Sequence, residues 1–248
     1  MTTKVKKTGK ARVYLIQYSP VENSIVSEVE NTVDRVLGEE SEEYVIYIYL
    51  YSSEEQLFSQ LYLKALEHNV NVLAKNMLAY HEAWSGIPCV HLPVKELLEL
   101  NKSTRLGVIE HEVAHAKLHG NIKYYLAPPG YFSDINLLYA VYCSVKDYEV
   151  GEYLKSRNIV ETQVNFIDYI LATLEPEDYY SAVKLCGLLL PYREKVSRTR
   201  ISIIENILQQ NILVLEKKYI EASQKDFYEK VIELYSFFEK LKKLNKYL

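Results

Sequence analysis

The stretch LGVIEHEVAHAKLHG, Leu106–Gly120, decides how the rest of this 248-residue chain is interpreted. Its apolar residues recur at the spacing of one helix face, which predicts a helix buried in the core of a domain. Ser103 or Thr104 stands just before the stretch, and both are residue types that cap helix N-termini. Glycine is typical of the position that follows a helix. We therefore expect a helix that runs from this cap to about His119.

Within this helix, His111, Glu112 and His115 form the pattern HExxH. Residues four apart on a helix lie on one face, one turn apart, so both imidazoles can point at one metal ion. Glu112 projects close to the same place and can act as general base on a water molecule that the ion activates. The pattern therefore predicts a Zn²⁺ site at His111 and His115, with Glu112 as the catalytic residue of a metallopeptidase.

A third zinc ligand has to come from elsewhere in the chain. The metzincin pattern is not met, because Leu118 and Asn121 stand where that pattern requires Gly and His. His119 lies a further turn along nearly the same face, but three histidines at successive four-residue steps do not converge easily on one ion. We expect His119 to support another ligand or to end the helix.

Better candidates lie on the next predicted helix, from about Ile135 to Arg157, which Ser133 or Asp134 can cap. Two helices that a short loop joins can pack antiparallel, which would bring carboxylates of the second helix opposite the two histidines. Asp147 and Glu149 are the two main candidates, and Glu152 is a weaker one.

The segment HEVAHAKLHG and the acidic helix after it resemble the gluzincins, and more narrowly the ImmA/IrrE-type and, less closely, the HtpX-like metallopeptidases. Those families follow HExxH with a helix that reads Glu-x-Glu-Ala-Asp/Asn, whose first Glu binds zinc. In this chain Asp147, Glu149, Val150 and Gly151 stand at the four named positions. The resemblance covers about residues 104–154 and implies a zincin-like fold with a carboxylate as third ligand.

Two departures from the family pattern, Asp147 in place of Glu and Gly151 in place of Asp or Asn, leave that ligand open between Asp147 and Glu149. Asp147 holds the family's ligand position, but an Asp has a shorter reach than a Glu. Glu149 has the longer arm, yet it shares a face with Tyr142, Val145 and Glu152. Asp147 lies on an otherwise apolar helix face, where a carboxylate is unfavourable unless it has a function. This slightly favours Asp147 as the zinc ligand.

The first half of the chain alternates between strand and helix patterns, which predicts an α+β fold with a mixed sheet around the zinc-binding helix. We expect strands at 12–18, 44–51, 69–80 and 86–94, and helices at 21–37 and 52–67. The second helix has Ser53 as its cap. Pro88 and Pro93 indicate that the last strand lies at a sheet edge.

Beyond Asn158 every pattern is helical. Two segments carry facing apolar seams, 201–215 and 227–241, which predicts an antiparallel helical hairpin. We therefore expect a metallopeptidase core over residues 1–158 and a helical region over 159–248. That region either packs on the core or forms a homodimer interface.

Composition narrows the class of protein further. A net charge of −4 gives no basic field for nucleic acid, so we expect no direct nucleic-acid contact. The basic stretch from Lys4 to Arg12 is interpreted as a solvated terminus. Cys89, Cys143 and Cys186 form no CxxC pair and are interpreted as small buried hydrophobic residues. No signal peptide or membrane-length apolar run is evident, so we expect a cytoplasmic protein with no membrane contact.

Weaker site candidates flank the helix. An edge strand at 87–93 could bind extended substrate by main-chain hydrogen bonds, with His91 facing the cleft, although a packed histidine is the commoner case. Tyr124, Tyr125 or Tyr131 could donate to the oxyanion of a tetrahedral intermediate. The expected partner is a peptide or protein substrate. The alternative function is a catalytically inactive zincin-fold module that binds metal and serves regulation or interaction.

Overall fold

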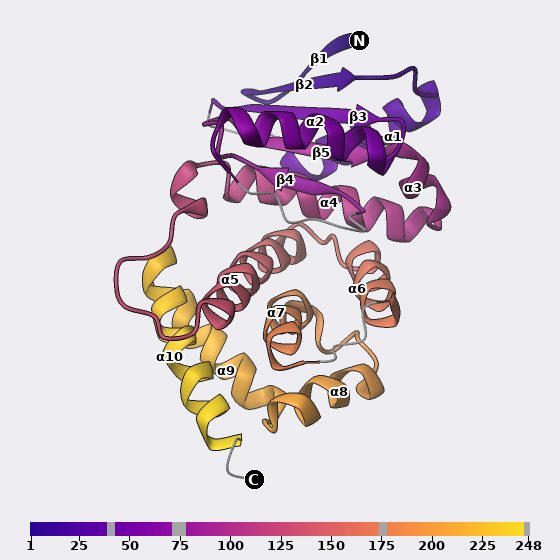
Figure 1. Cartoon of the computed structure of the whole chain (residues 1–248). Coiled ribbons are helices and arrows are strands. Elements are labelled where there is room, and N and C mark those ends of the chain that lie inside the picture. The colour runs from indigo at the N-terminus through magenta and orange to yellow at the C-terminus, as the bar shows by residue number, and fades with distance from the viewer. Residues whose placement is uncertain (39–42, 71–77, 174–177, 246–248) are drawn as a thin grey trace. The chain divides into compact units, whose positions relative to one another are not determined.

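The computed structural model describes residues 1–38, 43–70, 78–173 and 178–245 (Figure 1). These residues group into two compact units, 1–125 with 161–163, and 126–160 with 164–248. The first unit contains a five-stranded mixed sheet, and the second is built of helices. The α+β class and the mixed sheet predicted from the sequence are confirmed. Helix α5 (Ile135–Ser156) groups with the second unit, whereas the predicted core over residues 1–158 includes it; the division into domains stays a prediction.

The first unit carries all five strands that the described residues form. They are β1 (Thr2–Thr8), β2 (Ala11–Gln17), β3 (Val45–Tyr51), β4 (Tyr80–Glu82) and β5 (Cys89–Pro93). Its helices are α1 (Asn23–Leu37), α2 (Glu54–Glu67), α3 (Val94–Glu99), α4 (Lys102–Leu118) and the short 3-10 helix η1 (Ile122–Tyr125). Most of the strand expected at 69–80 falls on residues 71–77, which lie outside the described residues.

The sheet order is β1-β2-β3-β5-β4, with β2, β3 and β5 parallel and the two outer strands antiparallel to their neighbours. The prediction that 86–94 forms an edge strand is therefore wrong, because β5 lies between β3 and β4. Pro93 is tolerated there because it is the last residue of the strand. The edge on this side is β4, which the sequence analysis placed partly in a connection.

The first residues of the chain also differ from the prediction. Instead of a solvated terminus, Thr2–Thr8 forms a strand that turns at Gly9, where φ is +59°. Lys4 pairs with Glu30 of α1, and Lys6 pairs with Asp34 of the same helix. An edge strand rich in lysine is a common protection against unwanted strand pairing, and its charge hid the strand pattern.

The two faces of this sheet are covered differently. Alternation along β3 sends its tyrosines to one face, where Tyr51 packs with Leu57, Leu61 and other residues of α2. The intervening Ile46, Ile48 and Leu50 are completely buried on the opposite face, the one that α1 and α4 cover (Figure 1). A sheet covered on both faces explains why β3 reads as a continuous apolar and aromatic run.

The N-cap of helix α4 stands two or three residues earlier than the caps that the sequence predicts. Asn101 is the N-cap, and its side chain accepts a hydrogen bond from the Thr104 backbone N–H at 3.0 Å. The prediction of Ser103 or Thr104 as the cap is therefore wrong, because Asn serves equally well and stands earlier in the chain. In α2 the expected cap Ser53 is confirmed.

The second unit consists of helices in the residues described. They are α5 (Ile135–Ser156), α6 (Glu161–Thr173), α7 (Tyr179–Leu189), η2 (Leu190–Tyr192), α8 (Arg198–Leu208), α9 (Ile212–Ser223) and α10 (Phe227–Asn245). The first three residues of α6 group with the first unit. The seam expected over 201–215 spans two helices rather than one, because Gln209 adopts a left-handed conformation and Asn211 caps α9.

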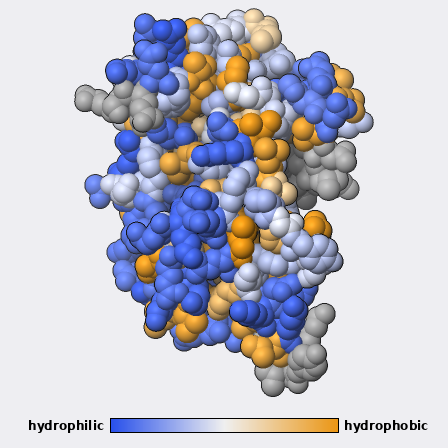
Figure 2. Space-filling view, turned by 90° about the vertical axis from the view of Figure 1, so that its left-hand side faces the viewer, coloured by the Kyte–Doolittle hydropathy of each residue, from blue (hydrophilic) through white to orange (hydrophobic). Residues whose placement is uncertain are grey.

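The surface fits an ordinary globular chain. The face shown in Figure 2 is mostly hydrophilic, with hydrophobic residues in small scattered groups. Among the residues described, no helix combines the length and the apolar character that crossing a membrane requires.

Candidate metal centre

Helix α4 places the two motif histidines side by side in the first unit. His111 and His115 are 5% and 6% exposed, and their Nε2 atoms lie 3.0 Å apart. The small residue Ala114 between them is completely buried, which lets α4 pack closely. The i, i+4 spacing therefore brings the two Nε2 atoms close together, as the sequence predicted.

This convergence can be compared with what zinc requires. Two nitrogens at about 2.0–2.1 Å from one tetrahedral ion lie roughly 3.3 Å from each other. The 3.0 Å separation of the Nε2 atoms of His111 and His115 differs from that value by a few tenths of an ångström. A small rotation of either ring is sufficient to close the difference. The two histidines fit a zinc ion without movement of the helix.

His119 contacts the imidazole ring of His115 and restricts its orientation. Its Nδ1 lies 3.0 Å from the Nδ1 of His115, and its side chain is completely buried. When the His115 Nδ1–H donates to His119, the lone pair of the His115 Nε2 is free to face an ion, the usual support for a metal-binding histidine. The His119 backbone N–H also bonds the His115 carbonyl and ends α4, as expected.

His81 of β4 is a residue that the sequence analysis missed. Its ring stacks on His115, with centroids 5.8 Å apart, and its Nδ1 lies 2.8 Å from the Tyr125 hydroxyl. The sequence pattern places His81 in the connection between two expected strands, whereas it lies on strand β4 beside α4. Of the three tyrosines suggested for the oxyanion, Tyr124 packs against His119 and Tyr131 is 92% exposed.

Glu110, next to the motif, anchors the rear of α4. Its carboxylate is completely buried and pairs with Arg35 of α1, while Thr162 and Gln163 donate hydrogen bonds to it. Burial raises the pKa of Glu110 against the lowering effect of Thr162 and Arg35. Glu112, the expected general base, is half-buried on α4. The two neighbouring glutamates thus lie in different environments, a difference that sequence spacing alone did not show.

The two candidates for the third ligand belong to α5 in the second unit, while the histidines belong to the first. Within its own unit, Glu149 forms an ion pair with Lys230 of α10 at 2.5 Å. Asp147 is half-buried, and its charge adds to the burial that raises the pKa of Cys143. The third ligand therefore stays a prediction, and the ion pair of Glu149 adds an argument for Asp147.

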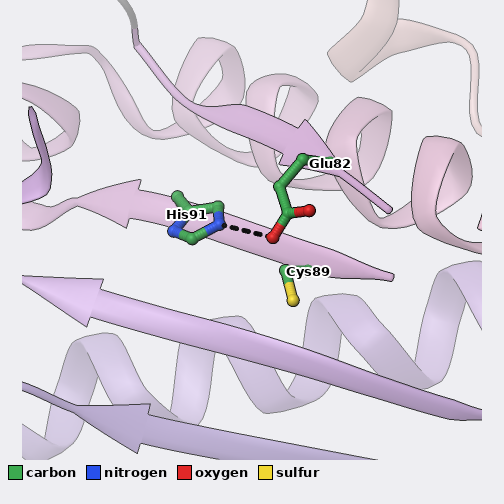
Figure 3. Close-up of side chains that lie close together, drawn as sticks. All are labelled: Glu82, Cys89 and His91. Atoms are coloured by element: carbon green, nitrogen blue, oxygen red, sulfur yellow. Dashed lines mark ion pairs between the residues drawn. The ribbon is translucent and has the colours of Figure 1, made fainter. Parts of the chain in front are cut away.

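The sequence left two alternatives for His91, a residue that faces a substrate cleft beside α4 or, more commonly, a packed histidine. His91 lies on the α2 face of the sheet, is 1% exposed, and forms a group with Glu82 and Cys89 (Figure 3). The commoner alternative, a packed histidine, is the one observed. Cys89 and Cys186 are buried, as the sequence indicated, and Cys143 is half-buried.

No protein family, curated protein or solved structure matches this chain.

Proposed function

We propose that this protein is a zinc-dependent metallopeptidase whose metal centre is built on α4. The observation that carries the proposal is the convergence of the His111 and His115 Nε2 atoms, with Glu112 next to them on the same helix. This residue set matches the requirement for metal-assisted hydrolysis, namely two imidazoles, an adjacent carboxylate and a buried setting. The resemblance of 104–154 to zincins supports the same conclusion.

Each residue of the set has a distinct task in peptide hydrolysis. His111 and His115 would hold the ion, which when bound would supply Lewis acidity and lower the pKa of a water molecule to about 7. Glu112 accepts the proton of the attacking water and delivers it to the leaving amine, so the proton count balances over one turnover. His119 keeps the His115 ring in the orientation that ligation requires.

The general base is tested by Glu112→Gln. This variant keeps the shape of the side chain but cannot accept a proton, so we expect cleavage of a peptide library to fall by about 10²- to 10⁴-fold or more. Zinc content, measured by mass spectrometry of the purified protein, should stay near that of the wild-type chain. Activity that survives the substitution would refute the role of Glu112, and zinc binding without any wild-type cleavage would favour an inactive module.

The third ligand is tested by comparing Asp147→Asn with Glu149→Gln. We propose that Asp147 is the ligand, so only Asp147→Asn should weaken zinc binding, and by more than the roughly 10- to 100-fold that loss of an outer supporting group costs. Glu149→Gln should instead loosen the contact with Lys230 and leave zinc affinity unchanged. Competition with a chromogenic chelator measures both affinities. The opposite ranking would assign the role to Glu149.

A further inference from the structure

A second group of metal-binding side chains lies in the β4–β5 ladder of the first unit. Glu82 and Cys89 are cross-strand partners, and His91 follows Cys89 two residues later on the same face (Figure 3). This is the α2 face of the sheet, whereas His81 of β4 points to the α4 face, where it stacks on His115. The group is therefore separate from the centre on α4, with the sheet between them.

The donor atoms of the group are close enough to share one ion. One atom from each of the three side chains lies within 4.8 Å of the other two, and all three residues are at most 2% exposed. The His91 Nε2 is 3.5 Å from the Glu82 Oε1, the pair joined by the dashed line in Figure 3. Two ligands of one tetrahedral zinc ion lie roughly 3.3 Å apart.

The His91 ring is oriented as a ligand would be. The Tyr51 hydroxyl lies 2.9 Å from the His91 Nδ1, which directs the Nε2 towards Glu82 and Cys89. Metal-binding histidines characteristically use one ring nitrogen for such a supporting hydrogen bond and the other for the ion. Tyr49 stacks on the same ring, with centroids 5.1 Å apart, and restricts its rotation.

Two buried polar atoms of the group are left without a hydrogen bond. Among the residues described, neither the Glu82 Oε2 nor the His91 Nε2 has a hydrogen-bond partner. The His91–Glu82 contact at 3.5 Å is longer than an ordinary hydrogen bond. Leaving such atoms unsatisfied in the interior is costly, so the two unsatisfied atoms favour a bound ligand at this group.

Lys64 of α2 now supplies the only positive charge seen in this group within the described part of the chain. Its Nζ hydrogen-bonds Glu82 and lies 3.2 Å from the Cys89 Sγ. The Lys64 side chain is 24% exposed, so its long stem gives it a route to solvent. An ammonium group in contact with a carboxylate and a thiol marks a place that accommodates a cation.

We propose that Glu82, Cys89 and His91 form a second binding site, for one soft divalent ion of the zinc class, with the Lys64 ammonium as its alternative occupant. A thiolate, an imidazole and a carboxylate are ligands that Zn²⁺ accepts, and soft sulfur selects against Mg²⁺ and Ca²⁺. On binding, the Cys89 thiol releases its proton to water and Lys64 swings outwards. The ion would fasten the edge strand β4, which also carries His81, to β5.

Cobalt substitution tests the site without interference from the centre on α4. Co²⁺ bound by a thiolate shows a near-ultraviolet charge-transfer band, which an ion held by His111 and His115 cannot produce because that centre has no sulfur. We expect the band in the wild-type chain and in a His111→Ala/His115→Ala variant. Cys89→Ser should abolish it, and the matched control Cys143→Ser should keep it.

Lys64→Met tests the competition between the two occupants. Without the ammonium, the dissociation constant for Co²⁺ should fall at least about tenfold, because the buried Glu82 carboxylate then has no other cation to pair with. X-ray absorption on the zinc-loaded His111→Ala/His115→Ala variant should show one Zn–S distance of about 2.3 Å. This readout does not depend on the folding of Cys89→Ser.

The proposal would be overturned if the charge-transfer band were absent in the wild type and in Lys64→Met, and the Zn–S distance were absent in the His111→Ala/His115→Ala variant. That result would leave the peptidase assignment intact, since the α4 centre is scored by zinc content and cleavage. Conversely, a wild-type chain that shows the charge-transfer band but cleaves no peptide would count against the peptidase assignment alone.

Discussion

Asp134 shows how much one side chain can organise in the second unit. It caps α5 by accepting a hydrogen bond from the Leu137 backbone N–H, and it also contacts Lys242 of α10 and Tyr180 of α7. Burial acts to raise the pKa of Asp134, but the hydrogen bonds from Lys242 and Leu137 outweigh it, so the pKa lies below its usual value. One carboxylate thus joins three helices.

This arrangement predicts a pH-dependent effect of Asp134→Asn. Asn can still cap α5 through its Oδ1, so the variant removes the charge and the Oδ2 atom that accepts from Lys242 and Tyr180, and we expect it to cost about 1 kcal/mol of unfolding free energy at neutral pH. Because the folded pKa is depressed, the contribution of the charge is present above the unfolded pKa of about 3.9 and is lost as pH falls through the folded pKa. Denaturant titrations at pH 7 and at pH 3 would measure the difference. A gap that stays equal at both pH values would contradict the ion-pair explanation.

At the scale of single residues, the sequence predicted the relative positions of side chains that lie on one helix. His111 and His115 converge because their spacing on α4 leaves them no alternative, and the pattern alone showed this. His81 could not be found in the same way, since its position depends on the pairing of β4 with β5, two segments whose register no local pattern determines. The group of Glu82, Cys89 and His91 was missed for the same reason.

Among the elements, helices α5 and α7 of the second unit approach each other closely at Ser144 and Gly187. Ser144 of α5 is completely buried; its hydroxyl donates to the Val183 carbonyl at 2.7 Å and accepts from the Gly187 backbone N–H at 2.8 Å. A Cβ added at Gly187 would lie 1.8 Å from the Ser144 carbonyl oxygen. Glycine is therefore required here for close approach of the two helices.

Two helical glycines of this unit provide a matched pair for a packing test. Gly187→Ala must push the α5 backbone away and should destabilise the chain by about 3 kcal/mol or more. Gly151→Ala meets the side chain of Pro191 at 2.5 Å, a ring in a short 3-10 segment that can shift, so we expect a smaller loss. Thermal unfolding of both variants gives the ranking. A larger loss for Gly151→Ala would contradict this ranking. It would mean that α7 yields to the added methyl group more easily than η2 does.

Element positions were predicted better than element ends and pairings. The extents of α1 and α2 follow their apolar periodicity closely, because an amphipathic pattern of this length has one plausible interpretation. The cap of α4, the break at Gln209 and the strand β1 were wrong or missed. Each of these depends on a choice between residues of nearly equal local preference, which tertiary contacts then decide.

At the scale of the whole molecule, metal binding should be visible as stability. An ion that binds only the folded chain stabilises it by mass action, by about 2.7 kcal/mol when free zinc is 100 times its dissociation constant. For a chain of this size that corresponds to roughly 5–10 °C in Tm. We expect the Tm to rise with zinc concentration and the rise to shrink in His111→Ala/His115→Ala. Calorimetry that finds the same rise in both proteins would exclude a contribution from the α4 centre.

The division of the chain into units shows where sequence reasoning reaches its limit. Strand and helix classes were predictable from the first half of the chain, and so was the mixed sheet around α4. The grouping of α5 with α7 and α10 was not, because the apolar residues of α5 are compatible with packing on either side of it. A helix that is buried around most of its circumference carries little periodicity to indicate its neighbours.

The short connection between β4 and β5, residues 83–88, limits which sequence changes homologues of this chain should tolerate. Successive residues of β4 serve opposite faces of the sheet: His81 contacts His115, and Glu82 joins Cys89 and His91. A one-residue slip in the pairing of β4 with β5 would exchange the two side chains and disable both groups together. Because the length of the connection sets this register, homologues that keep both groups should tolerate changes in its residues and reject changes in its length.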